Sequence, residues 1–169
     1  MKNLSLLILF LSVTFLSSCS TISSTYDFDQ STNFNIYKTY SLHQKGLDKL
    51  KINDLDKRRI IASIDREMAT KGFLKVNSNA DLIVNILASS TQEVSINNDY
   101  YGYWYGGISP STSEYTSGKI IIDIIDDKRN ILIWQGVGSG LDVSNTNTKH
   151  EKIPEAINKV LTNFPPKAK

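Results

Sequence analysis

Cysteine and histidine are scarce in this chain of 169 residues, which has one cysteine, Cys19, and two histidines, His43 and His150. A single cysteine excludes a disulfide within the chain and a cysteine-based zinc cluster. Two histidines leave few side chains for other metals or for acid–base chemistry. We therefore expect neither a metal site nor a bound cofactor.

A large excess of charge of one sign is also lacking. The chain has 19 Lys and Arg against 17 Asp and Glu, a formal net charge of +2. Proteins that hold the phosphate backbone of nucleic acids usually carry a strong basic excess, so the composition argues against a nucleic-acid partner. The hydrophobic share of 40% is enough for a buried core, and the length predicts a single domain.

Motifs of common catalytic and nucleotide-binding sites are missing as well. There is no Gly-x-Ser-x-Gly elbow around a nucleophilic serine. Gly136, Gly138 and Gly140 alternate along a predicted strand, and Leu141 stands where a dinucleotide fingerprint needs its third glycine. We interpret these glycines as positions that allow close packing or a bend. We expect a protein without catalytic residues that is not an enzyme.

The first 18 residues have the pattern of a bacterial secretion signal. Lys2 supplies a positive charge, residues 4–16 are mainly apolar, and small residues follow. As a helix, this apolar stretch of 13 residues would span about 20 Å, which is less than the ~30 Å hydrocarbon core of a bilayer. The segment is therefore typical of a cleaved signal peptide, placed at residues 1–18, and not of a permanent membrane span.

The expected cleavage point resembles a bacterial lipobox, with a branched apolar residue, two small residues and a cysteine. These are Leu16, Ser17, Ser18 and Cys19. In proteins with this motif the cysteine sulfur receives a diacylglyceryl group, the signal is cut before the cysteine, and the new amino group is often acylated. The alternative is an ordinary signal peptide whose cleavage site happens to contain a cysteine.

Lipid attachment would determine the location of the protein. Each buried methylene contributes roughly 0.8 kcal/mol to membrane binding, so two or three acyl chains on one residue form a lasting anchor. Cys19 would then be an anchor and not a nucleophile. Ser20, where other lipoproteins have Asp, resembles the pattern of proteins sent to the outer membrane, so we expect a periplasm-facing outer-membrane protein. Residues 19–25 are expected to be the lipidated cysteine and a short tether.

Hydrophobic periodicity predicts one α+β domain over residues 26–166, followed by a short tail at 167–169. Alternating apolar residues predict strands at residues 26–29, 37–42, 81–96, 115–126 and 131–140. A period of 3.6 residues predicts helices over 55–71 and 153–164. We expect Asn53 or Asp54 to cap the first helix, Gly72 to end it, and Pro154 to lie in the first turn of the second.

Together these elements predict a two-layer domain in the order β-β-α-β-β-β-α. Each helix has one apolar stripe, and the long strands have one apolar face, so both helices are expected to cover the same face of the sheet. We expect an antiparallel sheet of about four or five strands, the last three of which form a meander.

Aromatic residues are concentrated between the two longest predicted strands. Five of them lie within residues 97–113: Tyr100, Tyr101, Tyr103, Trp104 and Tyr105. Exposed rings with polar tips suit stacking on sugars, insertion at lipid headgroups or contact with a partner protein. The alternative is that the rings fold back over the end of the sheet and cap the core.

Several runs of residues, taken in order, are similar to the bacterial lipoprotein family called domain of unknown function 4136. They are YDFD at 26–29, Phe34, YKTY at 37–40, IDREMATKGF at 64–73, ADL at 80–82, GKIIIDIID at 118–126, LIWQG at 132–136 and FPP at 164–166. The chain departs from the family at Pro154, inside a helix that is usually free of proline, and in a short segment at 44–53. The resemblance implies an envelope lipoprotein with an α+β fold and no established reaction, so it supplies no catalytic residues.

Two functions follow as expectations. The first is a lipid-anchored envelope lipoprotein with an interaction or structural role, whose sheet edge or aromatic segment contacts another envelope protein. The alternative is a module that binds a small ligand or a glycan through the aromatic segment. In both, the membrane is a partner through the lipid on Cys19.

Overall fold

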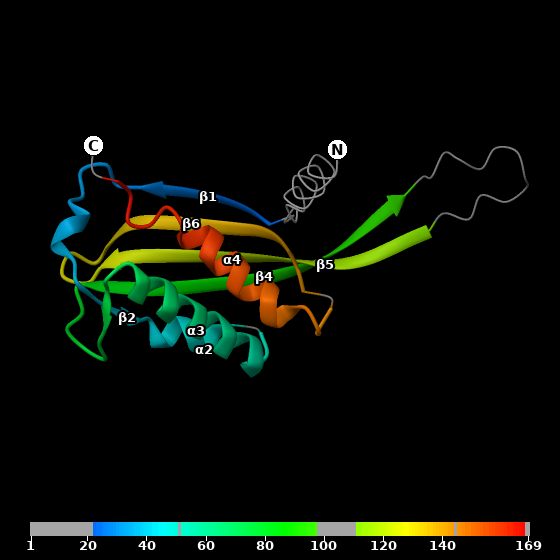
Figure 1. The fold of residues 1–169 in the computed structure, drawn as a ribbon, viewed down its shortest axis with the longest axis horizontal. Coiled ribbons are helices and arrows are strands. Elements are labelled where there is room, and N and C mark those ends of the chain that lie inside the picture. Colours follow the sequence, from blue (N-terminus) through cyan, green and yellow to red (C-terminus); the bar gives the residue numbers. More distant parts are fainter. Residues whose placement is uncertain (1–21, 51, 98–110, 144, 168–169) are drawn as a thin grey trace, which may run out of the picture.

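The computed structural model describes residues 22–50, 52–97, 111–143 and 145–167, apart from the side chains of residues 89–97, 111–117 and 142 (Figure 1). One mixed sheet contains six strands in the order β1-β6-β5-β4-β2-β3. The strands are β1 (Ser23–Phe28), β2 (Thr39–Leu42), β3 (Leu74–Lys75), β4 (Leu82–Asn97), β5 (Ser111–Asp126) and β6 (Ile131–Asp142). The helices are η2 (Phe34–Ile36), a 3-10 turn, and the α-helices α2 (Gln44–Lys49), α3 (Asp54–Thr70) and α4 (Lys149–Leu161).

The α+β class and the meander are confirmed, but the sheet is not purely antiparallel. Strands β4, β5 and β6 run antiparallel in sequence order, and β1 pairs antiparallel with β6. Strand β2, however, pairs in parallel with both β3 and β4. Because α2 and α3 lie between β2 and β4 in the chain, the connection crosses over and returns the chain in the same direction. The expected four or five strands become six, since β3 has only two residues and leaves no periodic signal.

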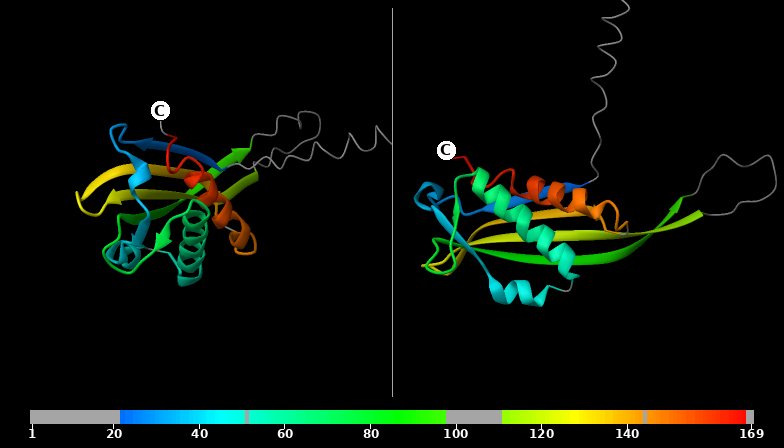
Figure 2. Two further views of the ribbon diagram at one scale, coloured as in Figure 1. Left: turned by 60° about the vertical axis from the view of Figure 1, so that its left-hand side comes forward. Right: turned by 60° about the horizontal axis from the view of Figure 1, so that its bottom comes forward.

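Helices α3 and α4 cover one face of the sheet, as the two-layer prediction requires (Figure 2). Two polar contacts join them, from Lys149 Nζ to Asp56 Oδ2 at 2.9 Å and from Asn158 Nδ2 to Glu67 Oε1 at 3.1 Å. The described part of the chain also contains a third α-helix that the sequence did not predict, the six-residue α2. Its Leu47 is buried in the core, but one apolar residue is too little to show a helical period.

The core lies between this face of the sheet and the two long helices. The inward side chains of the central strands are almost fully buried, and so are the apolar stripes of α3 and α4. They are Leu82, Val84, Ile86, Ile120, Ile122, Ile124 and Trp134 in the sheet, and Ile60, Ile64, Met68, Ile153, Ala156, Ile157, Val160 and Leu161 in the helices. Burying one large apolar side chain contributes about 1.5–3 kcal/mol, so these two stripes account for the docking of the helices.

The predicted ends of α3 are confirmed. Asn53 Oδ1 accepts a hydrogen bond from the backbone N–H of Asp56 at 2.8 Å, which satisfies one free donor of the first turn. At the other end Gly72 has a φ of 84°, and the N–H of Phe73 bonds to the carbonyl of Met68 at 3.0 Å. This is a Schellman motif, in which Phe73 folds back and is buried on the core.

The position predicted for Pro154 is wrong. Helix α4 begins at Lys149, so Pro154 lies in the second turn. The helix gains a turn because the N–H groups of Glu151 and Lys152 both bond to the carbonyl of Thr148, at 3.0 and 2.9 Å. The contact between Lys149 and Asp56 attaches this added turn to α3. Pro154 has no N–H for the usual bond to the preceding turn, and the helix continues without it.

The chain enters the sheet sooner than the sequence pattern indicates. Residues 23–25, expected in the tether, already belong to β1. Ile22 is 6% exposed and is part of the core, and Lys159 Nζ donates a hydrogen bond to its carbonyl at 3.1 Å. The body is thus fixed from Ile22 onward. Among the described residues, none of the helices has the length and apolarity needed to cross a bilayer.

Candidate functional site

Two groups of predicted site residues lie outside the residues that the structure describes. They are the lipobox residues Leu16, Ser17, Ser18 and Cys19, and the aromatic residues Tyr100, Tyr101, Tyr103, Trp104 and Tyr105. The strands that flank the aromatic segment are described, and Asn97 of β4 pairs with Ser111 of β5. This pair lies at the end of the sheet remote from η2 and from the carboxyl end of β1 (Figure 1).

The carboxylate of Asp81, in the ADL run that resembles the family, holds the start of β2 in place. Its Oδ2 accepts hydrogen bonds from the backbone N–H groups of Lys38 and Thr39, both at 2.9 Å, and from Thr39 Oγ1 at 3.0 Å. The two backbone donors, with the Thr39 hydroxyl, lower the pKa of Asp81. Because the ionised carboxylate accepts three hydrogen bonds from β2 and the residue before it, Asp81 stabilises the fold.

A second acidic residue, Asp126, joins the end of β5 to two other parts of the chain. Its Oδ2 accepts from the hydroxyl of Tyr37 at 2.7 Å and from Arg129 Nε at 2.8 Å, while Oδ1 accepts from the N–H of Arg129. Burial alone would raise the pKa of Asp126, but these hydrogen bonds outweigh it and lower the pKa to about 2. The burial of the Tyr37 hydroxyl and its hydrogen bond to Asp126 raise the pKa of Tyr37.

Like Asp126, Asp56 is buried, and it lies at the contact between helices α3 and α4. It accepts from Arg59 Nη1 at 2.6 Å on its own helix and from Lys149 Nζ at 2.9 Å on α4. Burial opposes ionisation, but the bonds from Lys149, Arg59 and Asn53 are together stronger and lower the pKa. With both cations in direct contact, Asp56 stays ionised and locks α3 against α4.

Gly136 and Gly138, two of the three glycines for which close packing or a bend was predicted, allow side chains to pack closely in β6. A Cβ at Gly136 would collide with the indole ring of Trp134 and lie 2.7 Å from Val160 Cγ1. A Cβ at Gly138 would likewise lie 2.7 Å from Val160 Cγ2. The bare backbone lets α4 approach β6 and leaves room for the buried Trp134 ring.

The histidines lie apart from these acidic groups. His43 Nδ1 is 3.0 Å from Asn85 Oδ1, and His150 Nε2 is 3.5 Å from Glu151 Oε1 in a largely exposed pair. Within the described ranges, no three His, Cys, Asp or Glu side chains are grouped in a way that could hold a metal ion.

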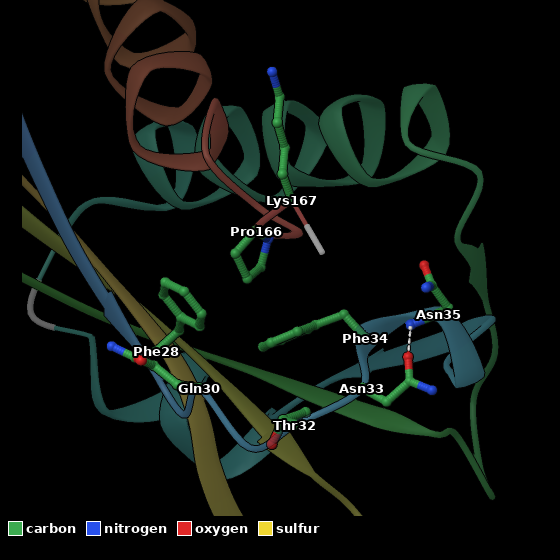
Figure 3. A pocket seen from close by; sticks show the side chains of 8 residues that line it. All are labelled: Phe28, Gln30, Thr32, Asn33, Phe34, Asn35, Pro166 and Lys167. Atoms are coloured by element: carbon green, nitrogen blue, oxygen red, sulfur yellow. Dashed lines mark hydrogen bonds between the residues drawn. The ribbon is translucent and has the colours of Figure 1, made fainter. Parts of the chain in front are cut away.

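A hollow beside the carboxyl end of β1 is the best candidate binding site in the described part of the chain. Its volume is about 270 Å³. It forms between the segment that follows β1 and the last residues after α4 (Figure 3). Its lining combines aromatic, amide and hydroxyl groups: Phe28, Gln30, Thr32, Asn33, Phe34, Asn35, Pro166 and Lys167.

Aromatic contacts build the floor of this hollow. The rings of Phe28 and Phe34 meet edge to face with their centroids 6.2 Å apart, and Phe34 makes a second such contact with Phe164 at 6.1 Å. Phe164 in turn contacts Trp134, with centroids 5.3 Å apart, so the hollow is attached to the core. The surrounding loop is fixed by its own polar groups.

Asp29 holds that loop in shape. Its Oδ1 accepts from the N–H and the hydroxyl of Ser31 at 2.9 and 2.7 Å, and its Oδ2 from Thr32 Oγ1 at 2.7 Å. Hydrogen bonds from the Ser31 and Thr32 side chains are the main reason that the pKa of Asp29 falls to about 2. Further along the loop, Asn33 Oδ1 accepts from the N–H of Asn35 at 3.1 Å.

The sequence did not predict this hollow. Residues 28–35 and residues 166–167 are far apart in the chain, and the packing of Phe34 against Phe164 joins the two segments. The sequence signal for this hollow is weak, because the segment from Gln30 to Asn33 is polar and fits neither a strand period nor a helix period.

Comparison with known proteins agrees with the fold. The family model described as a domain of unknown function (DUF4136) matches residues 24–166. None of the curated proteins compared with this chain is a match.

Two solved structures share the architecture at low sequence identity. A PDZ domain protein from Parabacteroides distasonis has a TM-score of 0.54 at 13% identity, and the match covers 87% of this chain but 36% of that protein. This chain therefore spans little more than a third of that protein's length. The PelC dodecamer from Paraburkholderia phytofirmans has a TM-score of 0.50 at 11% identity, covering 83% of this chain and 95% of PelC. A minor lipoprotein from Acinetobacter baumannii has a TM-score of 0.42 at 14% identity, and the match covers 76% of this chain and 92% of that protein.

Proposed function

We propose that this chain, which belongs to the family called domain of unknown function 4136, is a lipoprotein held at the outer membrane of the bacterial envelope by acyl chains on Cys19. Its role in this proposal is binding or structural, without catalysis. The observation that carries the proposal is the fixed position of Ile22, three residues beyond the lipobox cysteine.

The short distance between Cys19 and Ile22 makes the anchor effective. Three residues reach at most about 10 Å when fully extended. Ile22 is buried, and Lys159 on α4 holds its carbonyl, so the body cannot move farther from the membrane by releasing more chain. A lipid on Cys19 would keep the sheet next to the lipid headgroups.

The exposed edge of the sheet supports a binding role. Strand β1 lies at one edge, and five of its six residues are exposed. Its outer side can pair with an added strand, because an edge strand presents backbone N–H and C=O groups. Tyr26 is 46% exposed there, which offers a ring for contact with a partner.

The state of three hydrogen-bonded carboxylates supports a role without catalysis. Asp56, Asp81 and Asp126 are each held by two or more donors, and their pKa values are lowered. A general base near neutral pH needs the opposite, a raised pKa and a free lone pair that faces a substrate.

The test compares the natural protein with Cys19→Ala in cells that process lipoprotein precursors. We expect mass spectrometry to find the natural N-terminus at a diacylated or triacylated Cys19, with the protein in the outer-membrane fraction. Cys19→Ala should lose both the lipid and the membrane association. Ser24→Ala, in the exposed part of β1, is the matched control and should behave like the natural protein. An unmodified natural protein that starts at Met1 and stays in the aqueous fraction contradicts the proposal.

A further inference from the structure

The hollow of Figure 3 offers an apolar surface of aromatic character. The rings of Phe28 and Phe34 and the ring of Pro166 border it. Phe34 is 9% exposed, and Phe28 is half-buried and packed against the core, so both rings are held in place before any ligand arrives. Rigid rings of this kind suit a ligand with a flat face of C–H groups.

Uncharged hydrogen-bonding groups lie around the same hollow. The oxygen of the Asn33 amide accepts from the N–H of Asn35, which leaves the Asn33 amide nitrogen as a donor. In the ranges that the structure describes, no protein group bonds to the side-chain amides of Gln30 and Asn35. Each amide has two N–H donors and one acceptor oxygen, so it can form hydrogen bonds with adjacent hydroxyl groups of a ligand.

Charge is nearly absent from the described lining. Its one charged residue is Lys167, whose side chain points away from the hollow in Figure 3. The nearby carboxylate of Asp29 is already occupied by Ser31 and Thr32. An ionic ligand would therefore find no counter-charge directed at it, and the hollow suits a neutral ligand.

We infer that this hollow binds one sugar unit of a neutral saccharide, with a C–H face of the sugar against the half-buried ring of Phe28 and its hydroxyl groups on the amides of Gln30, Asn33 and Asn35. The volume of about 270 Å³ lies just below the range of roughly 300–1,000 Å³ for small-molecule pockets, which suits a single ring better than a long segment.

The choice of probe rests on the proposed function, whereas binding itself does not require the lipid. A protein on the periplasmic side of an outer membrane meets two sources of saccharide, the glycan strand of the cell wall and the oligosaccharide of the outer-membrane glycolipid. The probes are accordingly soluble cell-wall glycan fragments without peptide and the deacylated core oligosaccharide. A cell-wall stem peptide without sugar is the third probe.

The experiment is calorimetric titration of the full mature protein in detergent micelles with each probe, together with saturation-transfer NMR to identify the bound protons. We expect one saccharide to bind, with its ring C–H protons receiving the strongest transfer. The double variant Gln30→Ala, Asn35→Ala should weaken binding at least tenfold. Both side chains are exposed, so this variant should keep the fold. The exposed Asn77→Ala is the matched control and should bind as the natural protein does.

Three results would overturn the inference: no saccharide binds, the double variant binds a saccharide as tightly as the natural protein, or only the stem peptide binds. Each is distinct from a failure of the proposed function, which is read from the lipid and the membrane fraction of Cys19→Ala.

Discussion

Asp126 shows how one residue can hold three segments together. It lies at the end of β5, contacts Tyr37 just before β2, and binds Arg129 in the turn that leads to β6. Its exposed fraction is 5%, so water screens these contacts little. The ionised carboxylate thus stabilises the end of the sheet where the hairpin between β5 and β6 turns.

The pH dependence of stability should depend on this carboxylate. The pKa of Asp126 is about 2 in the folded protein and about 3.9 in an unfolded chain. A lowered folded pKa contributes stability that is complete above about pH 4 and is lost as the pH falls through about 2. We expect Asp126→Asn to lower the free energy of unfolding by about 2 kcal/mol at pH 7, and by progressively less as the pH falls from 4 to 2.

Thermal unfolding between pH 2 and pH 7 measures this difference. Asp127→Asn is the matched control, since the neighbouring Asp127 is exposed, and should change the melting temperature little. An Asp126→Asn deficit that stays constant down to pH 2 would show that lost packing, and not ionisation, accounts for the effect.

At the scale of the element, the first turn of α3 depends on its cap. Asn53 accepts from the N–H of Asp56 at 2.8 Å and also donates to Asp56 Oδ2 at 2.7 Å. We expect Asn53→Ala to destabilise the protein by about 1 kcal/mol, the usual effect of removing such a cap. Denaturant unfolding measures the change, with Asn77→Ala as the control. A result equal to that control would mean that Lys149 and Arg59 alone hold Asp56.

Elements with many periodic residues could be predicted from the sequence, and short or non-local ones could not. Helix α3 repeats its apolar stripe through Ile60, Ile64 and Met68, and β4 alternates from Leu82 onward, so both were found close to their true bounds. Helix α2 and strand β3 are held by tertiary contacts instead of a pattern of their own. The parallel pairing of β2 with β4 depends on the path of the chain in space, which local periodicity does not contain.

The candidate binding site shows the same limit. Phe34 and Phe164 could each be recognised as apolar positions, yet their contact across 130 residues forms the hollow. The side-chain amide of Asn35 can be recognised as part of a binding site only once the structure shows that residues 28–35 and 166–167 lie together. The lipobox, in contrast, is a linear pattern that needs no contact between distant segments, and it stays a prediction because residues 16–19 lie outside the described residues.

At the scale of the whole molecule, the proposed anchor sets the distance between the body and the bilayer. A ten-residue Gly-Ser spacer inserted between Ser20 and Thr21 adds up to about 35 Å of reach. We expect a fluorophore on Ser24→Cys to be quenched strongly by headgroup-labelled lipids in the protein without the spacer, and much less in the protein with it. Proteoliposomes lacking the labelled lipid are the control. Equal quenching with and without the spacer would contradict close attachment.

The position of β1 has a mechanical consequence. Any tension applied at the N-terminus, from an anchor or from a partner, enters the fold through the outermost strand, which is held by its ladder to β6 and by the contact of Ile22 with Lys159 on α4. The first contacts to yield would be those at Ile22 and Lys159, followed by the strand pairs from Ser23 toward Phe28. Stretching would separate β1 from β6 and disrupt the hollow at Phe28, while strands β4 to β6 and helices α3 and α4 remained folded.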